Sequence, residues 1–157
     1  MDEILNKYLK IEHLNVSREA CLDFEKFINY VLQKNKILNI IGKSTENRGI
    51  IRERHIIDCA QALEFIDLNS NSVYDLGSGA GFPGIILGII FKSRGNTVRM
   101  KLFEKSYHKS VFLRDIVRKL NLDIEIIQKD IFQIEELNAS TIIARAFKPM
   151  PVMLKLV

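Results

Sequence analysis

The fold is decided by the stretch Asp75-Leu76-Gly77-Ser78-Gly79-Ala80-Gly81-Phe82-Pro83-Gly84. This stretch joins a short apolar run, which we predict as a strand over 73–77, to an apolar segment, which we predict as a helix over 82–91. The three glycines at alternate positions let the backbone turn tightly and approach a ligand without Cβ clashes. The stretch therefore predicts a strand, a ligand-binding loop and a helix.

After this unit, short apolar runs alternate with longer segments of helical type. We predict strands over 98–103, 124–127 and 141–144, and helices over 107–120 and 149–156. Such alternation predicts an α/β fold with a doubly wound, mostly parallel sheet, whose ligands bind at the carboxyl ends of the strands. No strand follows the last helical segment, so we expect that the C-terminal strands of the sheet are missing.

The first part of the chain has a helical pattern instead. From Ser17, a candidate N-cap, apolar residues including Phe24, Phe27 and Val31 form the stripe of an amphipathic helix. A second helix is predicted over 48–65. Its expected inward residues are Ile57, Ala60 and Leu63, and its expected outward residues are Arg52, Glu53 and Glu64. The sequence thus predicts an N-terminal helical segment, 1–72, that ends in the turn cluster 69–72, and a ligand-binding core, 73–157.

Length and composition set broad limits on the class of protein. The chain has 157 residues, 47% of them hydrophobic and 27% charged, which is typical of a soluble globular domain. Its beginning lacks the pattern of a secretory signal, and its most apolar run, 85–91, is far shorter than the roughly 20 residues that cross a bilayer. Its two cysteines have no partner at metal-ligand spacing. We therefore expect a cytoplasmic protein with no membrane span and no metal.

The charge of the chain is unevenly distributed. The formal net charge is +4, and the segment 92–119 contains nine Lys and Arg against two acidic residues. A second basic stretch, 34–54, contains six basic against two acidic residues. Composition alone does not decide between solvated helix faces and contacts to nucleic-acid phosphates.

The spacing of the glycines favours S-adenosylmethionine over a dinucleotide. A dinucleotide loop of the G-x-G-x-x-G type would place its third glycine at position 82, where this chain has Phe82. S-adenosylmethionine has no pyrophosphate, so its loop does not need to cradle phosphate. We expect Gly77 and Gly79 to lie against the cofactor and Asp75 to face its positively charged methionyl portion. The sequence therefore predicts a Rossmann-like, class I S-adenosylmethionine-dependent methyltransferase core.

Residues after the second and third predicted strands are further candidates for cofactor binding. Glu104 can accept hydrogen bonds from both ribose hydroxyls. NAD offers the same hydroxyls, so Glu104 does not discriminate between the cofactors, and an ion pair with Lys101 or Lys105 is the alternative role. Ile131 and Phe132 adjoin the place where such folds hold an adenine, although Phe132 suits the core equally well.

The segment 144–149, after the fourth predicted strand, narrows the class of methyl acceptor. It lacks the Asn/Asp-Pro-Pro-aromatic motif that is used to methylate exocyclic amines. A Pro-Cys nucleophile for attack at pyrimidine C5 is also absent, because neither Cys21 nor Cys59 lies near a predicted strand end. A heteroatom nucleophile is the simplest remaining target.

Four blocks of sequence carry a resemblance to a known family. They are Asn35-Lys36-Ile37-Leu38-Asn39, Arg54-His55-Ile56-Ile57-Asp58, the stretch 75–84 with its Gly-Phe-Pro-Gly, and Ala144-Arg145-Ala146-Phe147. On these blocks the chain resembles, nearly end to end, the small-subunit ribosomal RNA methyltransferase G family, also called glucose-inhibited division protein B. That family methylates guanine N7 in 16S rRNA.

The resemblance implies a cofactor site and a substrate. By the family's pattern, S-adenosylmethionine would contact five residues: Gly77, Phe82, Ile131, Phe132 and Arg145. The partner would be 16S rRNA or the small ribosomal subunit, and we expect the protein to be a monomer. The family extends beyond Val157, through the last strands of the sheet.

Three polar residues are candidates for a role in the reaction. His55 and Asp58 lie three apart on one predicted helix face and are a candidate acid/base pair, although a cap or core hydrogen bond is the more common role. Guanine N7 already has a lone pair, so positioning and electrostatics would supply most of the acceleration, with Arg145 orienting the cofactor or the base. Two alternative functions stay open: an NAD-dependent oxidoreductase on the same fold, and a non-catalytic, truncated RNA-binding relic.

Overall fold

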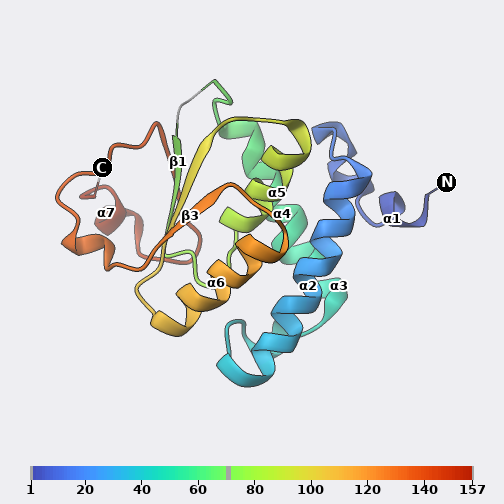
Figure 1. The fold of residues 1–157 in the computed structure, drawn as a ribbon, viewed down its shortest axis with the longest axis horizontal. Helices are drawn as coiled ribbons and strands as arrows, with labels where there is room; N and C mark the ends of the chain where they lie inside the picture. Colours follow the sequence, from blue (N-terminus) through green and yellow to red (C-terminus); the bar gives the residue numbers. More distant parts are fainter. Residues whose placement is uncertain (1, 70–71, 157) are drawn as a thin grey trace.

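A computed structural model of the chain describes residues 2–69 and 72–156 (Figure 1). Its centre is a sheet of four strands: β1 (Ser72–Leu76), β2 (Arg99–Phe103), β3 (Ile124–Ile127) and β4 (Thr141–Ile143). All of the pairings are parallel, and the strand order is β3-β2-β1-β4. The order reverses beside β1, so the switch point where α/β folds bind ligands lies between β1 and β4. The predicted α/β class with a parallel sheet is confirmed.

Most predicted elements are present, with small shifts at their ends. β3 has the predicted bounds, whereas β1 ends before Gly77, because the φ of +72° at that glycine is incompatible with a strand. The next helix, α5 (Gly84–Arg94), begins two residues later than predicted, after Pro83. The helix α6 (Tyr107–Lys119) is capped by Ser106, whose hydroxyl accepts from the Lys109 N–H, and α7 spans Met150–Met153. The loop over 77–83 is therefore longer than the sequence pattern indicated.

The N-terminal segment is helical, as predicted. It begins with α1 (Glu3–Asn6) and a 3₁₀ segment over Leu9–Leu14, which lead into the long helix α2 (Arg18–Leu38). The Ser17 hydroxyl accepts from the Ala20 N–H at 3.1 Å, which confirms the predicted N-cap. Asn39 ends α2 in the left-handed conformation, and a short 3₁₀ turn over Lys43–Thr45 follows. Of the predicted turn cluster 69–72, Ser70 and Asn71 lie outside the described residues.

The second predicted helix is a continuous helical run that changes its pitch. It consists of α3 (Arg48–Ile51), a π-helical turn over Arg52–Ile57, α4 (Asp58–Gln61) and a 3₁₀ turn over Ala62–Phe65. The three residues predicted to face inward, Ile57, Ala60 and Leu63, are buried. The prediction that Arg52 faces outward is wrong: its side chain forms a 2.7 Å ion pair with Glu25 of α2 and is 15% exposed. Glu25 also accepts from Tyr8 and Arg48, so this carboxylate joins three parts of the N-terminal segment.

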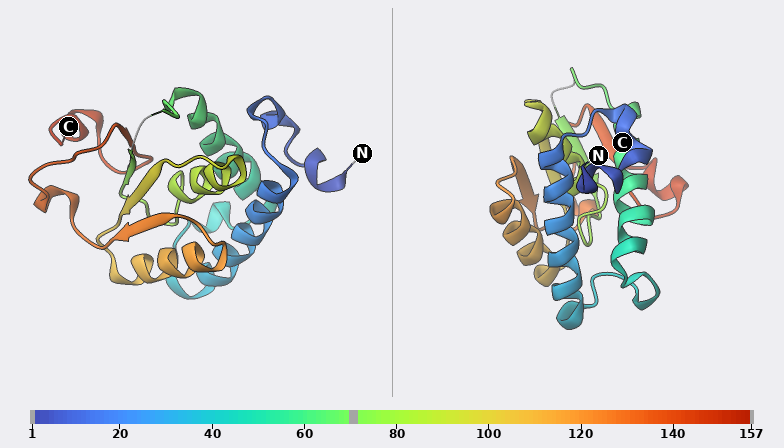
Figure 2. Two further views of the ribbon diagram at one scale, coloured as in Figure 1. Left: turned by 45° about the horizontal axis from the view of Figure 1, so that its top comes forward. Right: turned by 90° about the vertical axis from the view of Figure 1, so that its right-hand side faces the viewer.

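The helices α2 to α6 all lie on one face of the sheet, and the chain after β3 covers part of the other face together with α7 (Figures 1 and 2). α2 packs on both α5 and α6. Buried side chains of the N-terminal segment, such as Phe24 and Phe27, belong to the same hydrophobic cluster as Ile85 and Leu102 of the core. The N-terminal helices therefore share one core with the sheet, and the boundary at residue 72 stays a prediction. Within the described ranges, no helix is long and apolar enough to cross a membrane.

We predict that Gly84→Ala destabilises the fold. A Cβ atom at this position would lie 2.6 Å from Asp75 Oδ2 and 2.8 Å from Leu102 Cγ, and both of these side chains are fully buried. Overpacking of this kind costs about 1–3 kcal/mol. Urea unfolding should show a lower midpoint for Gly84→Ala than for the control Gly42→Ala, whose Cβ meets no atom closer than 3.9 Å. Equal midpoints for the two variants would contradict the prediction.

Candidate functional site

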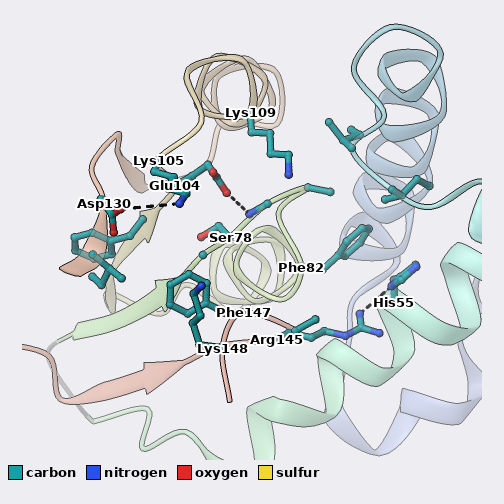
Figure 3. A pocket seen from close by; sticks show the side chains of 18 of the residues that line it. His55, Ser78, Phe82, Glu104, Lys105, Lys109, Asp130, Arg145, Phe147 and Lys148 are labelled. Carbon is teal, nitrogen blue, oxygen red and sulfur yellow. Dashed lines mark hydrogen bonds and ion pairs between the residues drawn. The ribbon is translucent and has the colours of Figure 1, made fainter. Parts of the chain in front are cut away.

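A pocket of about 510 Å³ lies at the carboxyl ends of the strands, which is the size range of small-molecule sites (Figure 3). Eight of the ten candidate site residues of the sequence analysis line it, and Asp58 and Asp75 do not: the eight are His55, Gly77, Gly79, Phe82, Glu104, Ile131, Phe132 and Arg145. These residues come from the N-terminal helices and from the loops after all four strands. The fold thus brings together residues that lie up to 90 positions apart in the chain, such as His55 and Arg145.

The glycine loop forms one wall of the pocket. The N–H groups of Gly77 and Ser78 both donate to the Phe103 carbonyl, at 2.9 and 3.0 Å, so the loop continues the pairing of β1 with β2. At Gly77 the backbone has positive φ, and a Cβ would lie 2.1 Å from the ring of Phe147. Glycine is therefore required here both by the backbone conformation and by the close approach of the aromatic ring.

Glu104, directly after β2, presents a fixed carboxylate to the pocket. Its Oε2 accepts from the Gly79 N–H and its Oε1 from the Ser106 N–H, each at 2.8 Å. The surface ion pairs that were the alternative are not formed, because Lys101 pairs with Glu125 and Lys105 with Asp130. Each carboxylate oxygen has lone-pair capacity beyond these bonds, so Glu104 can accept hydrogen bonds from a pair of hydroxyls.

Asp75 lies beneath the loop and does not line the pocket. Its carboxylate is fully buried, and its Oδ2 accepts from the Gly84 N–H at 3.0 Å. Its Oδ1 has no hydrogen-bond partner among the described residues. Burial raises the pKa of Asp75 to about 7. The observed contact of Asp75 holds the loop to the start of α5, and its predicted contact with a cofactor stays a prediction.

Two aromatic side chains line the pocket beyond β3 and β4. Phe132 follows Asp130, whose carboxylate accepts from the Phe132 N–H, and it is 49% exposed, so it lines the pocket and is not a core residue. Its ring lies nearly parallel to that of Phe147, with the centroids 6.3 Å apart. Sequence reasoning quoted Phe147 as part of a block but did not place it in the site. Its position just after β4 is the feature of the sequence that could have identified Phe147 as a site residue.

Arg145 connects the end of β4 to the N-terminal helices. Its guanidinium donates to the Arg54 carbonyl at 2.7 Å. It also donates to Nδ1 of His55 at 2.9 Å (Figure 3). Arg54 and His55 both belong to the π-helical turn, a feature that is often found at functional sites. The structure shows no hydrogen bond between His55 and the candidate partner Asp58, and Nδ1 of His55 accepts from Arg145 instead. Burial and the neighbouring positive charge of Arg145 lower the pKa of His55.

Lysine side chains surround the pocket. The residues are Lys105, Lys109, Lys129 and Lys148, which lie in the segments that follow β2, β3 and β4. Lys105 and Lys109 belong to the basic segment 92–119 that the sequence analysis singled out. Part of the positive charge of that segment therefore lies at the rim of the site and not on a remote helix face.

The segment 40–45 forms part of the pocket wall, which sequence reasoning did not predict. Ile40, Ile41, Gly42 and Thr45 line the pocket. The segment is held by Asn35, a buried residue of α2 whose Oδ1 accepts from the Ile41 N–H at 2.8 Å. The residues of this segment carry no catalytic pattern, so no local signal marked them as part of a site. Across residues 2–69 and 72–156, no group of three or more His, Cys, Asp or Glu is arranged to hold a metal ion.

We predict that Asp75→Asn changes the pH dependence of stability. Because burial raises the pKa of Asp75 from 3.8 to about 7, the folded protein keeps a proton between these pH values that the unfolded chain has released. The contribution of Asp75 to stability therefore falls as pH rises from about 4 to about 7. Calorimetric Tm values between pH 5 and 7.5 should fall more for the wild type than for Asp75→Asn. Tm values that change equally with pH in the wild type and in Asp75→Asn would contradict the raised pKa of Asp75.

Curated relatives of this chain share one description. A protein from Pelagibacter ubique (strain HTCC1062), named ribosomal RNA small subunit methyltransferase G, is 48% identical over 157 residues, which are all of this chain and 74% of the relative. Proteins of the same name from Cereibacter sphaeroides (strain ATCC 17025 / ATH 2.4.3) and Rickettsia felis (strain ATCC VR-1525 / URRWXCal2) are 37% and 32% identical. These matches cover 88% and 87% of this chain but 66% and 67% of the relatives.

The fold has counterparts among solved structures. The structure of coclaurine N-methyltransferase bound to N-methylheliamine and SAH is similar to this chain with a TM-score of 0.54 at 15% identity, over 90% of this chain and 49% of that one. At this identity the likeness concerns the fold alone, and it agrees with the predicted class I architecture. The family model described as rRNA small subunit methyltransferase G matches residues 20–157. With this match and the 48% identical relative, the chain belongs to the rRNA small subunit methyltransferase G family.

Proposed function

We propose that this chain is an S-adenosylmethionine-dependent methyltransferase that acts on N7 of a guanine in the 16S rRNA of the small ribosomal subunit. The names of its relatives support the substrate class. The observation that carries the proposal is the Glu104 carboxylate, which two backbone N–H groups hold beside the glycine loop in the pocket. The proposal includes a cytoplasmic, monomeric enzyme that uses no metal.

The pocket fits the proposed cofactor. Glu104 would accept hydrogen bonds from the ribose hydroxyls, and Ile131 and Phe132 would form an apolar wall against the adenine. The backbone of Gly77 and Gly79 would lie against the methionyl portion. When bound, S-adenosylmethionine supplies an electrophilic methyl group.

The residues of the pocket would act by binding and orientation. Guanine N7 has a lone pair in the plane of the ring, so its attack on a methyl carbon needs no general base. Holding the base in line with the methyl group would then supply most of the acceleration. Arg145 contributes by fixing the wall between β4 and the N-terminal helices.

The two alternative functions are not favoured. A dinucleotide-dependent oxidoreductase would need a glycine where this chain has Phe82, whose side chain is 8% exposed and stacks on His55. The family match also does not favour an oxidoreductase or a non-catalytic relic. An experiment can distinguish an enzyme from a relic, because a relic would bind the cofactor and RNA without transferring the methyl group.

The reaction itself can be tested with the 157-residue chain, S-adenosylmethionine carrying a labelled methyl group, and small ribosomal subunits from cells that lack this methylation. We expect label in the RNA as N7-methylguanine at one site, mapped by borohydride reduction and aniline cleavage. Calorimetry should show binding of S-adenosylhomocysteine and none of NADH. Heat with NADH alone would contradict the proposal, and bound S-adenosylhomocysteine without any methyl transfer would support the relic.

We predict that the lysines at the rim contact RNA phosphates. Replacing Lys109 or Lys148 by Gln should weaken binding to the small subunit and reduce the slope of log affinity against log salt by about one per lysine. Affinity for S-adenosylhomocysteine should stay unchanged. Lys7→Gln, on the N-terminal segment and outside the pocket lining, is the matched control. Salt slopes that are the same in all three variants would show that these lysines do not contact phosphate.

A further inference from the structure

Phe147 is an aromatic residue of the pocket that has no role in the proposed function so far. It follows β4, is partly buried and lines the pocket. A Cβ atom built on Gly77 would lie 2.1 Å from the Phe147 ring, so the ring rests directly on the glycine loop. In Figure 3 the ring lies inside the pocket beside Ser78 of this loop. The position of Phe147 is therefore defined relative to the loop that would bind the cofactor.

The backbone before Phe147 directs the side chain into the pocket. Ala146 has a φ of +50°, in the left-handed region that is unfavourable for a residue with a Cβ atom. On one side of this turn Arg145 bonds to the N-terminal helices, and on the other side Phe147 lines the pocket. Such strain at a residue other than glycine is found most often at functional sites. The conformation of Ala146 thus points to a role for the side chain that it places.

Two aromatic rings in the pocket correspond to two purines that the site has to hold. S-adenosylmethionine has an adenine, and the target base is a guanine. The rings of Phe132 and Phe147 lie at 23° to one another, with their centroids 6.3 Å apart. Phe132 is the ring assigned to the adenine, whereas Phe147 rests on Gly77, whose backbone is assigned to the methionyl portion. Because the sulfur and its methyl group lie at the methionyl end of the cofactor, Phe147 is the ring near the reacting group.

We propose that the Phe147 ring stacks on the target guanine and stabilises the positive charge that this base acquires in the reaction. This inference rests on the proposed function. The N7 lone pair forms the bond to the methyl carbon, and the electron pair of the broken carbon–sulfur bond stays on sulfur, so the positive charge moves from sulfur to the purine. A cation is attracted to the face of an aromatic ring. Phe147 therefore binds the charged purine of the transition state more strongly than the neutral guanine.

The charged side chains around Phe147 agree with this role. Lys109, Arg145 and Lys148 also line the pocket, and each of them repels a positively charged purine. An aromatic face is the group that can offset this repulsion without adding a carboxylate that would bind the lysines. Lys148 directly follows Phe147 in the chain, so it is placed to contact a phosphate of the nucleotide whose base stacks on Phe147.

The kinetic test replaces each of the two rings by an aliphatic side chain. Phe147→Leu should lower kcat by about 10- to 100-fold on small ribosomal subunits that lack the methylation, because it removes the stacking face. KM for the subunits should change little, since phosphate contacts supply most of the binding. Phe147→Tyr keeps the ring and should keep most of kcat. In calorimetry with S-adenosylhomocysteine, Phe147→Leu should bind as the wild type does, whereas the matched variant Phe132→Leu should bind more weakly.

A second test detects stacking without methyl transfer. The chain has no Trp, so Phe147→Trp introduces a single indole fluorophore. With S-adenosylhomocysteine bound, 7-methylguanosine monophosphate should quench its emission at about 5- to 10-fold lower concentration than guanosine monophosphate, because only the methylated base carries the positive charge. The control is Phe65→Trp, at an 85% exposed position outside the pocket lining, which should respond equally to both nucleotides.

The outcomes distinguish this inference from the proposed function. A Phe147→Leu variant with the kcat of the wild type would overturn stacking on the target and leave the methyltransferase assignment intact. A loss of S-adenosylhomocysteine affinity as large as the loss of kcat would do the same, as would Phe147→Trp emission that responds equally to both nucleotides or to neither. A wild-type chain that binds S-adenosylhomocysteine but methylates no RNA would overturn the proposed function, and with it this inference.

Discussion

The hydrogen bond between the buried Asp75 carboxylate and the Gly84 N–H, 3.0 Å long, is the interaction on which the pocket depends. It joins the end of β1 to the first turn of α5 and so determines the span of the glycine loop between them. The middle of the loop is held in turn by Glu104, through the Gly79 N–H. Two carboxylates at the ends of adjacent parallel strands thus give the loop its shape, one from beneath and one from the pocket side. A loop of glycines has little conformational preference of its own and needs such external bonds.

A second set of contacts joins the N-terminal helices to this framework. The Phe24 and Phe27 side chains share the core with α5, and Asn35 holds the segment 40–45 at the pocket wall. Arg145 completes the connection, because its guanidinium bonds to two groups of the π-helical turn. The helices are therefore part of the site as well as part of the core. The side of the pocket away from Glu104 exists because these helices pack against the sheet.

The fold could be predicted in most of its parts because its signals are local. The period of apolar residues indicated the strands and helices, and Ser17 marked the start of α2. The pattern of apolar residues gave a wrong prediction where a contact with a distant part of the chain determines the burial of a side chain. Arg52 was expected in solvent, but Glu25 on another helix holds it. The helix over 48–65 gave no sign of its π-helical turn. Most of the candidate site residues were also predicted, since strand ends collect at one edge of a parallel sheet.

The sequence by itself determined the class of fold, the position of the glycine loop and the resemblance to a family, because each of these depends on residues that are close together in the chain. Only the tertiary structure decided what the individual side chains do. It placed Asp75 beneath the loop instead of in the pocket, brought Phe147 onto Gly77, and paired His55 with Arg145 instead of Asp58. The physical reason is that burial and hydrogen bonding depend on neighbours from distant parts of the chain, which no local pattern specifies.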